Sequence, residues 1–320
     1  MKLICGKATL AVAMSVAATA AFGADLVIPD PNYASGRATA HTVKAIVEDA
    51  LGLQVDMVNT TAVPVIWEAM SRGTGEIDAW TETWLPNQQG LVDRYVTSEK
   101  TVTLSDKSFP AIQGYCVTEK TYDDFGIKSV FDLANPENAA KFDTNGNGKG
   151  KIWIGPQGWQ STNIEMIRAR DYGFAEFFDL QSTDEAVATA GLDAAVKAGK
   201  PWVGYCYGPH QNFALYKLKL LQEPAHDPAK FVVVTPKDDP DWMAKSKVAS
   251  AYADASVHIA WSSNLAERQP EAAHLLAQIE FTNDDVNKWA LDIIEGQDPD
   301  KVAKDWVNGH KDLIAKWMSK

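Results

Sequence analysis

Short apolar strand patterns alternate with amphipathic helix patterns along most of this 320-residue chain. The first five elements that we expect are a strand, a helix, a strand, a helix and a strand, at residues 25–29, 38–51, 53–58, 63–70 and 77–84. A βαβαβ order predicts a parallel sheet covered by helices, because each crossover helix packs its apolar face on the sheet. Such a sheet places its ligand-binding loops at the carboxyl ends of its strands.

The rest of the chain repeats this alternation and predicts a second lobe inserted into the first. We expect strands at 113–118, 152–155, 201–207 and 256–261, a helix at 163–171, and closing helices at 270–279, 283–296 and from 299 onward. The predicted fold class is therefore α/β with two lobes. The first comprises residues 25–112 and 252–320, and the second comprises residues 113–251. A ligand site is expected in the cleft between them.

Residues 1–24 are expected to be a cleaved signal peptide rather than part of the fold. Lys2 and Lys7 give a positive start, and residues 8–21 form a small, apolar, uncharged segment that is too short to span a bilayer. Removing both lysines takes the formal net charge from −12 to about −14. This charge argues against nucleic acid or an anionic membrane surface as a partner, because both require a basic surface.

Cys116 and Cys206 are the cysteines outside the predicted signal peptide. Both occur in the sequence Gly-Tyr-Cys within predicted strands, which suggests that these strands are neighbours in one sheet. In an exported chain such a pair is typical of a disulfide. Two small buried thiols would fit the same pattern. The sequence leaves both alternatives open, because it does not give the distance between the Cα atoms.

Aromatic residues stand where the ligand loops are expected, in a chain with 11 tryptophans. Trp84 ends a strand just before Leu85-Pro86, Trp159 lies in a strand-to-helix turn, and Tyr207 ends another strand. A methylated ammonium group cannot donate hydrogen bonds, but an aromatic face attracts it by about 0.5–2 kcal/mol. Several such faces could bind a methylated cation together. Each ring could instead fill a core.

Three short motifs resemble those of the glycine betaine/proline betaine binding-protein family of ABC importers. They are Trp84-Leu85-Pro86, Pro156-Gln157-Gly158-Trp159 and Tyr207-Gly208-Pro209-His210, and segments 141–149 and 258–273 resemble the family as well. The resemblance spans most of the chain beyond the predicted signal peptide. It implies a type II-like periplasmic binding protein, with two parallel-sheet-rich α/β lobes joined by a two-strand hinge.

The resemblance also implies which residues form the ligand site. The matching motifs imply that the walls of an aromatic cage are formed by Trp84, Trp159 and Tyr207. Tyr207 departs from the family, which usually has tryptophan there, and Tyr33 is similar to a further cage residue of choline-binding relatives. The implied ligand is glycine betaine. Choline, carnitine, proline betaine, trimethylamine N-oxide and dimethylsulfoniopropionate are alternatives. The implied protein is a monomer in the periplasm, and its partner is the membrane permease of an ABC importer.

The anionic end of a betaine requires hydrogen-bond donors. Gln160 and Ser161 open the helix after Trp159, where free N–H groups and the helix dipole favour a carboxylate. Ser161 would equally serve as an ordinary helix cap. His210 is a further candidate donor.

Three residues on predicted strands fit either a ligand site or a structural role. Glu82 alternates to the same side of its strand as Trp84, so it would either face the cation or act as a structural acid. Tyr115 and Tyr205 are further candidates for the ligand site, although both could simply pack in a core.

The segment around residue 145 matches the first half of a calcium-binding loop motif. Asp143, Asn145 and Asn147 stand at the first ligand positions, but Ile154 occupies the position of the bidentate glutamate. A turn is the first interpretation and a structural Ca²⁺ the second. We otherwise expect no metal and no cofactor.

Catalytic motifs are missing from the sequence, which has no Gly-x-Ser-x-Gly elbow, no complete phosphate loop and no cysteine-rich metal set. We therefore expect a binding protein and not an enzyme. The alternative from another class is a secreted carbohydrate-active hydrolase with an acidic pair in an aromatic cleft.

Overall fold

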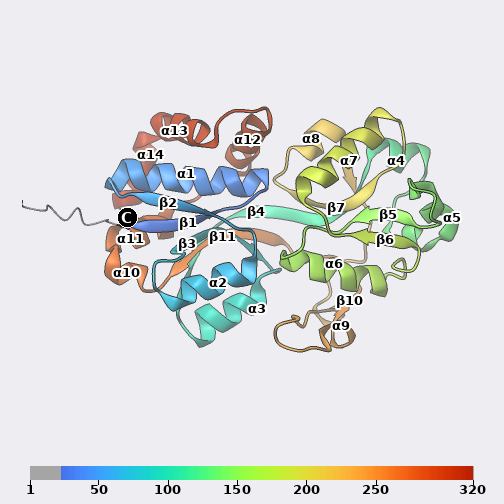
Figure 1. The fold of residues 1–320 in the computed structure, drawn as a ribbon, viewed down its shortest axis with the longest axis horizontal. Helices are drawn as coiled ribbons and strands as arrows, with labels where there is room; N and C mark the ends of the chain where they lie inside the picture. The colour runs from blue at the N-terminus through green and yellow to red at the C-terminus, as the bar shows by residue number, and fades with distance from the viewer. Residues whose placement is uncertain (1–22, 320) are drawn as a thin grey trace, which may run out of the picture.

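The computed structural model describes residues 23–319, so residues 1–22 of the predicted signal peptide lie outside the described residues. Figure 1 shows two groups of helices and strands side by side, which we call the first and the second lobe. The long strand β4 (Val102–Thr118) runs from the first lobe into the second. Within the described range, no helix combines the length and the apolar character needed to cross a membrane.

The first lobe combines elements from both ends of the chain. From the N-terminal part come β1 (Leu26–Asp30), α1 (Ala34–Leu51), β2 (Val55–Asn59), α2 (Val63–Arg72), β3 (Ala79–Leu85), α3 (Gln89–Val92) and a π-helical turn (Asp93–Ser98). From the C-terminal part come β11 (Ala255–Ser262), α10 (Leu265–Arg268), α11 (Pro270–Gln278), α12 (Asn283–Ile294), α13 (Pro299–Gly309) and α14 (Lys311–Ser319). Strands β1 and β2 pair in parallel, as predicted for a βαβ unit.

The second lobe lies between these two parts in the sequence. Its helices are α4 (Glu119–Asp124), α5 (Pro136–Ala139), α6 (Gln160–Asp171), α7 (Glu185–Lys197), α8 (Asn212–Tyr216) and α9 (Trp242–Lys245), with short 3₁₀ turns at Val130–Ala134, Ala140–Phe142 and Pro228–Lys230. Its strands are β5 (Gly150–Trp153), β6 (Phe178–Gln181), β7 (Val203–Gly208), β8 (Leu218–Leu220), β9 (Phe231–Val232) and β10 (Lys247–Val248).

The main sheet is mixed, which corrects the parallel sheet expected from the βαβαβ order. Its strand order is β3-β11-β4-β7-β5-β6, with β8 also paired to β4. Strand β11 is antiparallel to β3 and β4, and β7 is antiparallel to β4, whereas β5 is parallel to β6 and β7. The reason is that the chain leaves the first lobe along β4 and returns along β11, so these two strands run in opposite directions.

The predicted crossings between the lobes fall on these connecting segments. Strand β4 pairs with β11 up to Ala111 and with β7 from Ile112 onward. The return crossing that we predicted near residue 251 falls between β10 and β11. The division of the chain at these two positions remains our prediction.

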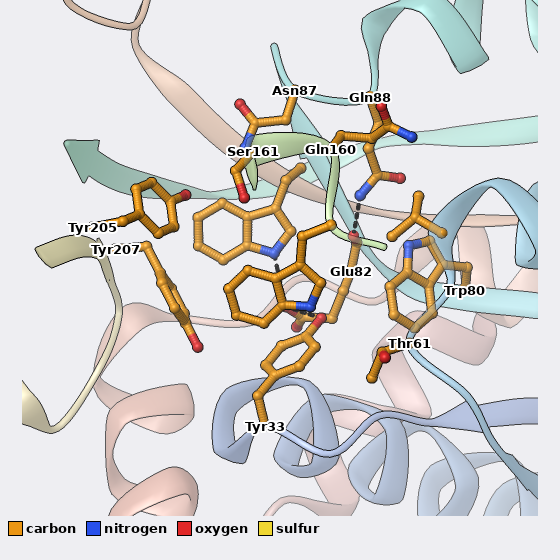
Figure 2. A pocket seen from close by; sticks show the side chains of 13 residues that line it. Tyr33, Thr61, Trp80, Glu82, Asn87, Gln88, Gln160, Ser161, Tyr205 and Tyr207 are labelled. Atoms are coloured by element: carbon orange, nitrogen blue, oxygen red, sulfur yellow. Dashed lines mark hydrogen bonds between the residues drawn. The ribbon is translucent and has the colours of Figure 1, made fainter. Parts of the chain in front are cut away.

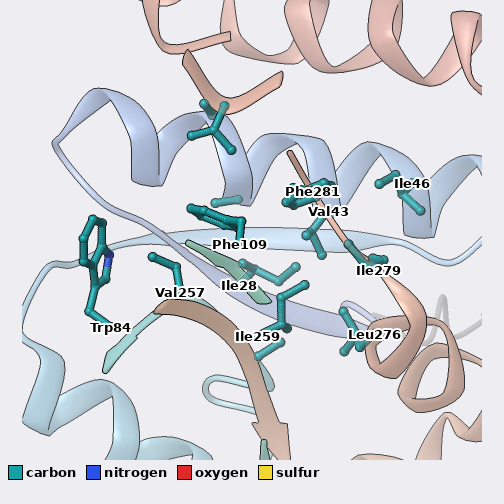
Figure 3. Packing of buried hydrophobic residues seen from close by; sticks show 14 of the residues in the cluster. Ile28, Val43, Ile46, Trp84, Phe109, Val257, Ile259, Leu276, Ile279 and Phe281 are labelled. Carbon is teal, nitrogen blue, oxygen red and sulfur yellow. The ribbon is translucent and has the colours of Figure 1, made fainter. Parts of the chain in front are cut away.

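The largest cluster of buried apolar side chains lies under α1 in the first lobe and extends to Ile164 and Ile167 of α6 in the second. Figure 3 shows Val43 and Ile46 of α1 above Ile28 of β1, with Ile259 of β11 on the other side of Ile28. All four side chains are buried. Trp84 lies at one end of the same cluster, so a well-packed core holds the strand end that carries this indole.

A disulfide between Cys116 and Cys206 joins β4 to β7, with the two Cα atoms 5.7 Å apart. Cys116 stands opposite Gly204, and Cys206 stands opposite Gly114, so the bond runs diagonally between the strands. Of the two alternatives that the sequence left open, the structure therefore contains the disulfide.

Candidate functional site

A pocket lies between the lobes, a usual place for a small-molecule site. Both lobes contribute to its lining (Figure 2). The lining residues are Tyr33, Thr61, Val63, Trp80, Glu82, Trp84, Asn87 and Gln88 from the first lobe, and Trp159, Gln160, Ser161, Tyr205 and Tyr207 from the second. The structure thus brings together eight of the residues singled out in the sequence: Tyr33, Glu82, Trp84, Trp159, Gln160, Ser161, Tyr205 and Tyr207.

Strand β3 supplies three lining side chains by simple alternation. Trp80, Glu82 and Trp84 are two positions apart, so they project from the same face of the strand. Pro86 follows the strand and cannot donate a hydrogen bond to a neighbouring strand, which ends the ladder next to Trp84. The strand end therefore faces the pocket.

Three aromatic rings in the pocket are close to mutually perpendicular. The ring centroids of Tyr33 and Trp159 are 5.1 Å apart at an interplanar angle of 75°. The rings of Trp159 and Tyr207 are 5.6 Å apart at 78°, and those of Tyr33 and Tyr207 are 6.5 Å apart at 88°. Trp84 adds a fourth ring, 5.4 Å from that of Tyr207 and at 87° to it. Such rings can present several faces to one small cation, as walls that meet at a corner.

The hydroxyl of Tyr207 is held by a hydrogen bond to Glu185, a residue of the second lobe that does not line the pocket. It donates a hydrogen bond of 2.6 Å to Glu185 at the start of α7. Nε2 of His210 lies 2.9 Å from the same carboxylate oxygen, and Nδ1 of His210 accepts from the backbone N–H of Asn212. Nε2 is therefore the nitrogen that donates to Glu185. Burial, helped by Glu185, raises the pKa of Tyr207 well above its ordinary value, so Tyr207 remains a neutral donor.

Glu82 is fully buried at the bottom of the pocket. Its carboxylate accepts hydrogen bonds from the indole of Trp84 at 2.8 Å, from the hydroxyl of Thr39 at 2.8 Å and from that of Tyr33 at 3.4 Å. Burial raises the pKa of Glu82 to about 7, and the three hydrogen bonds limit the rise because they stabilise the charged form.

The start of α6 presents free backbone donors to the pocket. The helix begins at Gln160, and its N-cap residue Trp159 makes no side-chain cap hydrogen bond. The first N–H groups of a helix have no partner within the helix, and the helix dipole is positive there. Gln160 and Ser161 both line the pocket, so an anionic or hydroxyl oxygen of a ligand would find donors at this end.

Five lining residues were not among the predicted site residues: Thr61, Val63, Trp80, Asn87 and Gln88. Trp80 shares the alternation that identified Glu82 and Trp84, so this signal could have found it. Its indole N–H is buried and has no acceptor among the described residues. It is therefore a buried donor without a partner on a residue that lines the pocket.

Two predicted residues lie outside this pocket. Helix α6 covers Tyr115, whose hydroxyl donates to the backbone carbonyl of Glu165, while the guanidinium of Arg168 lies 4.9 Å from its ring centroid. The expectation that Tyr115 contacts the ligand is therefore corrected. His210 lies behind Tyr207, with ring centroids 4.9 Å apart, and acts through Glu185 rather than on the pocket.

The half calcium loop forms a closed turn. The carboxylate of Asp143 accepts from the backbone N–H groups of Gly146 at 2.7 Å, Asn147 at 3.3 Å and Gly148 at 2.9 Å. These bonds, led by that from Gly148, lower the pKa of Asp143. The side-chain amide of Asn147 donates to Asp179, and Asn145 lies in the same exposed loop. Because the carboxylate is directed at its own backbone, the turn interpretation accounts for Asp143.

The charge of the pocket is unusual for a catalytic cleft. Among the described residues, Glu82 is the only carboxylic acid in the lining, and no lysine, arginine or histidine lines it. Glycoside hydrolysis ordinarily requires two carboxyl groups that flank the scissile bond. The lining therefore does not support the hydrolase alternative.

Comparison with known proteins connects this geometry to a family. Residues 24–309 match the family described as the substrate binding domain of ABC-type glycine betaine transport system. The chain is 26% identical over 141 residues to a glycine betaine/carnitine transport binding protein of Listeria monocytogenes, covering 44% of this chain and 39% of the relative. It is 24% identical over 218 residues to the glycine betaine-binding periplasmic protein of Dickeya dadantii, covering 65% of this chain and 64% of the relative. The chain thus spans less than two thirds of the length of these relatives.

Solved structures agree in fold. Lactococcal OpuAC in its closed form with glycine betaine has a TM-score of 0.70 and 22% identity, covering 92% of this chain and 98% of that chain. An ABC-transporter choline binding protein in complex with choline has a TM-score of 0.72 and 21% identity, covering 92% of this chain and 91% of that chain. At these identities the likeness shows the fold alone, and it confirms the predicted two-lobed α/β class. The chain belongs to the family of substrate-binding domains of ABC-type glycine betaine transport systems.

Proposed function

We propose that this protein captures a small methylated ammonium or sulfonium compound in the pocket and delivers it to the permease of an ABC importer. The observation that carries the proposal is the cluster of four aromatic rings, contributed by both lobes, next to a buried carboxylate. A methylated onium group offers no hydrogen-bond donor, so ring faces and one negative charge are the groups that attract it. The proposed aromatic cage consists of Tyr33, Trp84, Trp159 and Tyr207.

The other parts of the pocket suit the remainder of such a ligand. The N-terminus of α6 and the indole N–H of Trp80 offer donors to an oxygen of the ligand. Glycine betaine is the ligand that the family resemblance favours. Choline, carnitine, proline betaine, trimethylamine N-oxide and dimethylsulfoniopropionate carry the same kind of methylated group.

The proposed place of action is the periplasm, after removal of the predicted signal peptide. Two relatives, from Dickeya dadantii and Escherichia coli, are named as periplasmic binding proteins. We propose that the protein acts as a monomer, because its two lobes together build the whole pocket.

The cage is tested by removing its indoles one at a time. We expect Trp84→Ala and Trp159→Ala each to weaken the binding of glycine betaine and choline by at least about tenfold, because each removes about 1.4 kcal/mol or more of ring contact. Isothermal titration calorimetry measures the affinity of each variant for both ligands. Binding should also change the tryptophan emission of the native protein.

The matched control is Trp242→Ala in α9, which removes a tryptophan that does not line the pocket. Its affinity should equal that of the native protein. Native affinity in both cage variants would contradict the cage, and saccharide turnover by the native protein would contradict a purely binding role.

A further inference from the structure

The carboxyl group of Glu82 has no cationic partner for its charged form among the described residues. Its side chain is fully buried, and the three groups that donate to it, from Trp84, Thr39 and Tyr33, are all neutral. In the described part of the chain, no ion pair involves Glu82. A buried carboxylate without a counter-ion is costly, because its charge has lost most of its hydration.

The groups around Glu82 add no positive charge. Tyr33 precedes α1, and Tyr207 stands at the end of β7 with its hydroxyl on a second carboxylate, Glu185 of α7. The histidine behind this pair, His210, is bonded to Glu185 and lies outside the lining. The side of the pocket next to Glu82 is therefore negative or neutral.

We infer that Glu82 selects ligands by net charge, so that the pocket binds a methylated ammonium with a net positive charge and no carboxylate more tightly than a zwitterion. This inference rests on the proposed function. A bound cation supplies the counter-ion that the protein does not. A zwitterion brings its own carboxylate into the same small pocket, and the repulsion between two carboxylates offsets part of the attraction. Choline-like ligands would then rank ahead of glycine betaine, the reverse of the order that the resemblance favours.

Charge selection by Glu82 also predicts that binding depends on pH, because Glu82 gains and loses its proton near neutral pH. Because burial raises the pKa of Glu82 to about 7, the free protein carries both protonation states near neutral pH. A bound cation stabilises the charged form and lowers that pKa, so binding releases a proton. The affinity for a cation must therefore rise as the pH increases through about 7. A zwitterion perturbs Glu82 less, so its affinity should depend less on pH.

Choline and glycine betaine are a matched pair for the test, because both carry a trimethylammonium group and neither changes charge between pH 6 and pH 8. Calorimetry on the native protein should show choline affinity rising by about five- to tenfold from pH 6 to pH 8, if binding lowers the pKa by one unit or more. Glycine betaine affinity should change by less than about twofold. Titrations in two buffers of different ionisation enthalpy should show proton release at pH 7 for choline.

The variant Glu82→Gln removes the charge and keeps the size of the side chain. It should flatten the choline profile and lower the ratio of choline to glycine betaine affinity at pH 8 by about tenfold or more. The matched control Glu271→Gln removes an exposed carboxylate from α11 and should leave this ratio unchanged. If Glu82→Gln does not fold, the pH profiles and the proton release of the native protein still test charge selection by Glu82.

The outcomes separate this inference from the proposed function. Binding of both ligands with the same pH profile, or an unchanged ratio in Glu82→Gln, would overturn charge selection and leave the function standing. A native protein that binds neither choline, glycine betaine nor the other onium compounds would overturn the proposed function itself.

Discussion

The hydroxyl of Tyr207, in the proposed cage, has its partner outside the pocket. The family resemblance implies tryptophan at this position, and a tyrosine ring brings a hydroxyl that must find a partner once it is buried. Glu185 accepts from this hydroxyl at 2.6 Å, and His210 holds Glu185 from the other side at 2.9 Å. The ring of Tyr207 is thereby oriented toward the rings of Trp84 and Trp159.

Because of this network, removing the whole ring of Tyr207 and removing only its hydroxyl should have different effects on binding and stability. Tyr207→Ala removes a ring face and should weaken ligand binding by more than about tenfold. Tyr207→Phe keeps the face but leaves Glu185 with one donor fewer, so it should weaken binding by less than about fivefold and lower the free energy of unfolding by about 1–2 kcal/mol. Calorimetry and denaturant titration measure the two effects.

The control for the lost hydroxyl is Tyr216→Phe, at a partly exposed tyrosine of α8 outside the pocket. Neither its affinity nor its stability should change by a comparable amount. Equal losses of affinity in Tyr207→Phe and Tyr207→Ala would show that the hydroxyl, and not the ring face, contacts the ligand.

The sequence predicts side chains that follow a regular alternation better than side chains from loops. Glu82 and Trp84 were found because they alternate on one strand. Thr61 and Asn87 follow no such period, so only the folded chain brings them to the pocket. Tyr115 shares the Gly-Tyr-Cys sequence of Tyr205 and stands opposite it in the sheet. The hydroxyl of Tyr115 donates to Glu165 within α6, whereas that of Tyr205 donates to Gln113, and only Tyr205 lines the pocket.

At the scale of elements, the start of α1 has to leave room for a cage ring. Tyr33 is the N-cap residue of α1, and Gly36 lies in the first turn. A Cβ atom at Gly36 would come within 2.5 Å of Cε2 of Tyr33 and 2.6 Å of Cγ of Pro31. Real Cβ contacts are not this short, so the glycine is what lets the ring of Tyr33 pack on the helix.

Gly36→Ala should therefore displace Tyr33 and weaken ligand binding by about fivefold or more, the contribution of about one ring face. Alanine is by itself the better helix former by about 1 kcal/mol, so a poorer helix would not explain the loss. Calorimetry measures the affinity, and thermal unfolding measures the stability.

The matched control is Gly191→Ala in α7, where an added Cβ meets no atom within 4 Å. This variant should keep the native affinity and be as stable as the native protein or more stable. Native affinity in Gly36→Ala as well would remove Tyr33 from the cage.

The order of elements was easier to predict than their pairing. The apolar period of α1 and of the C-terminal helices is local, and most predicted helices exist within a few residues of the expected bounds. Helix α7 was not predicted, although its first residue anchors Tyr207. Strand direction depends on partners that are distant in sequence, such as β11 on β4, and a local pattern carries no information about them.

At the scale of the whole molecule, the two lobes meet through contacts beside the pocket. The side-chain amides of Asn87 in the first lobe and Gln113 in the second donate to each other at 2.8 and 3.0 Å. Glu68 of α2 and Lys237 of the second lobe form an ion pair at 3.1 Å. A ligand in the pocket can stabilise this arrangement only through contacts that are better here than in a more open form. The proposed cage would satisfy this condition, since its rings come from both lobes.

The disulfide allows the stability of the fold to be separated from ligand binding. Cys206 lies between Tyr205 and Tyr207 on β7, so alternation directs its side chain to the opposite face of the sheet from the pocket. Cys116 and Cys206 are 90 residues apart in sequence, and closing a loop of this length restricts the unfolded chain. The chain-entropy model gives about 4–5 kcal/mol for such a loop.

We therefore expect the double variant Cys116→Ala, Cys206→Ala to lose several kcal/mol of unfolding free energy and to keep its ligand affinity while it is folded. Denaturant titration with and without a reductant measures the first effect, and calorimetry at 10–20 °C, near the usual stability maximum, measures the second. The reductant should destabilise the native protein but not the double variant, which provides the control. A loss of affinity in a fully folded double variant would mean that the covalent link between β4 and β7 also positions Tyr207, and the cage would then depend on both faces of the sheet.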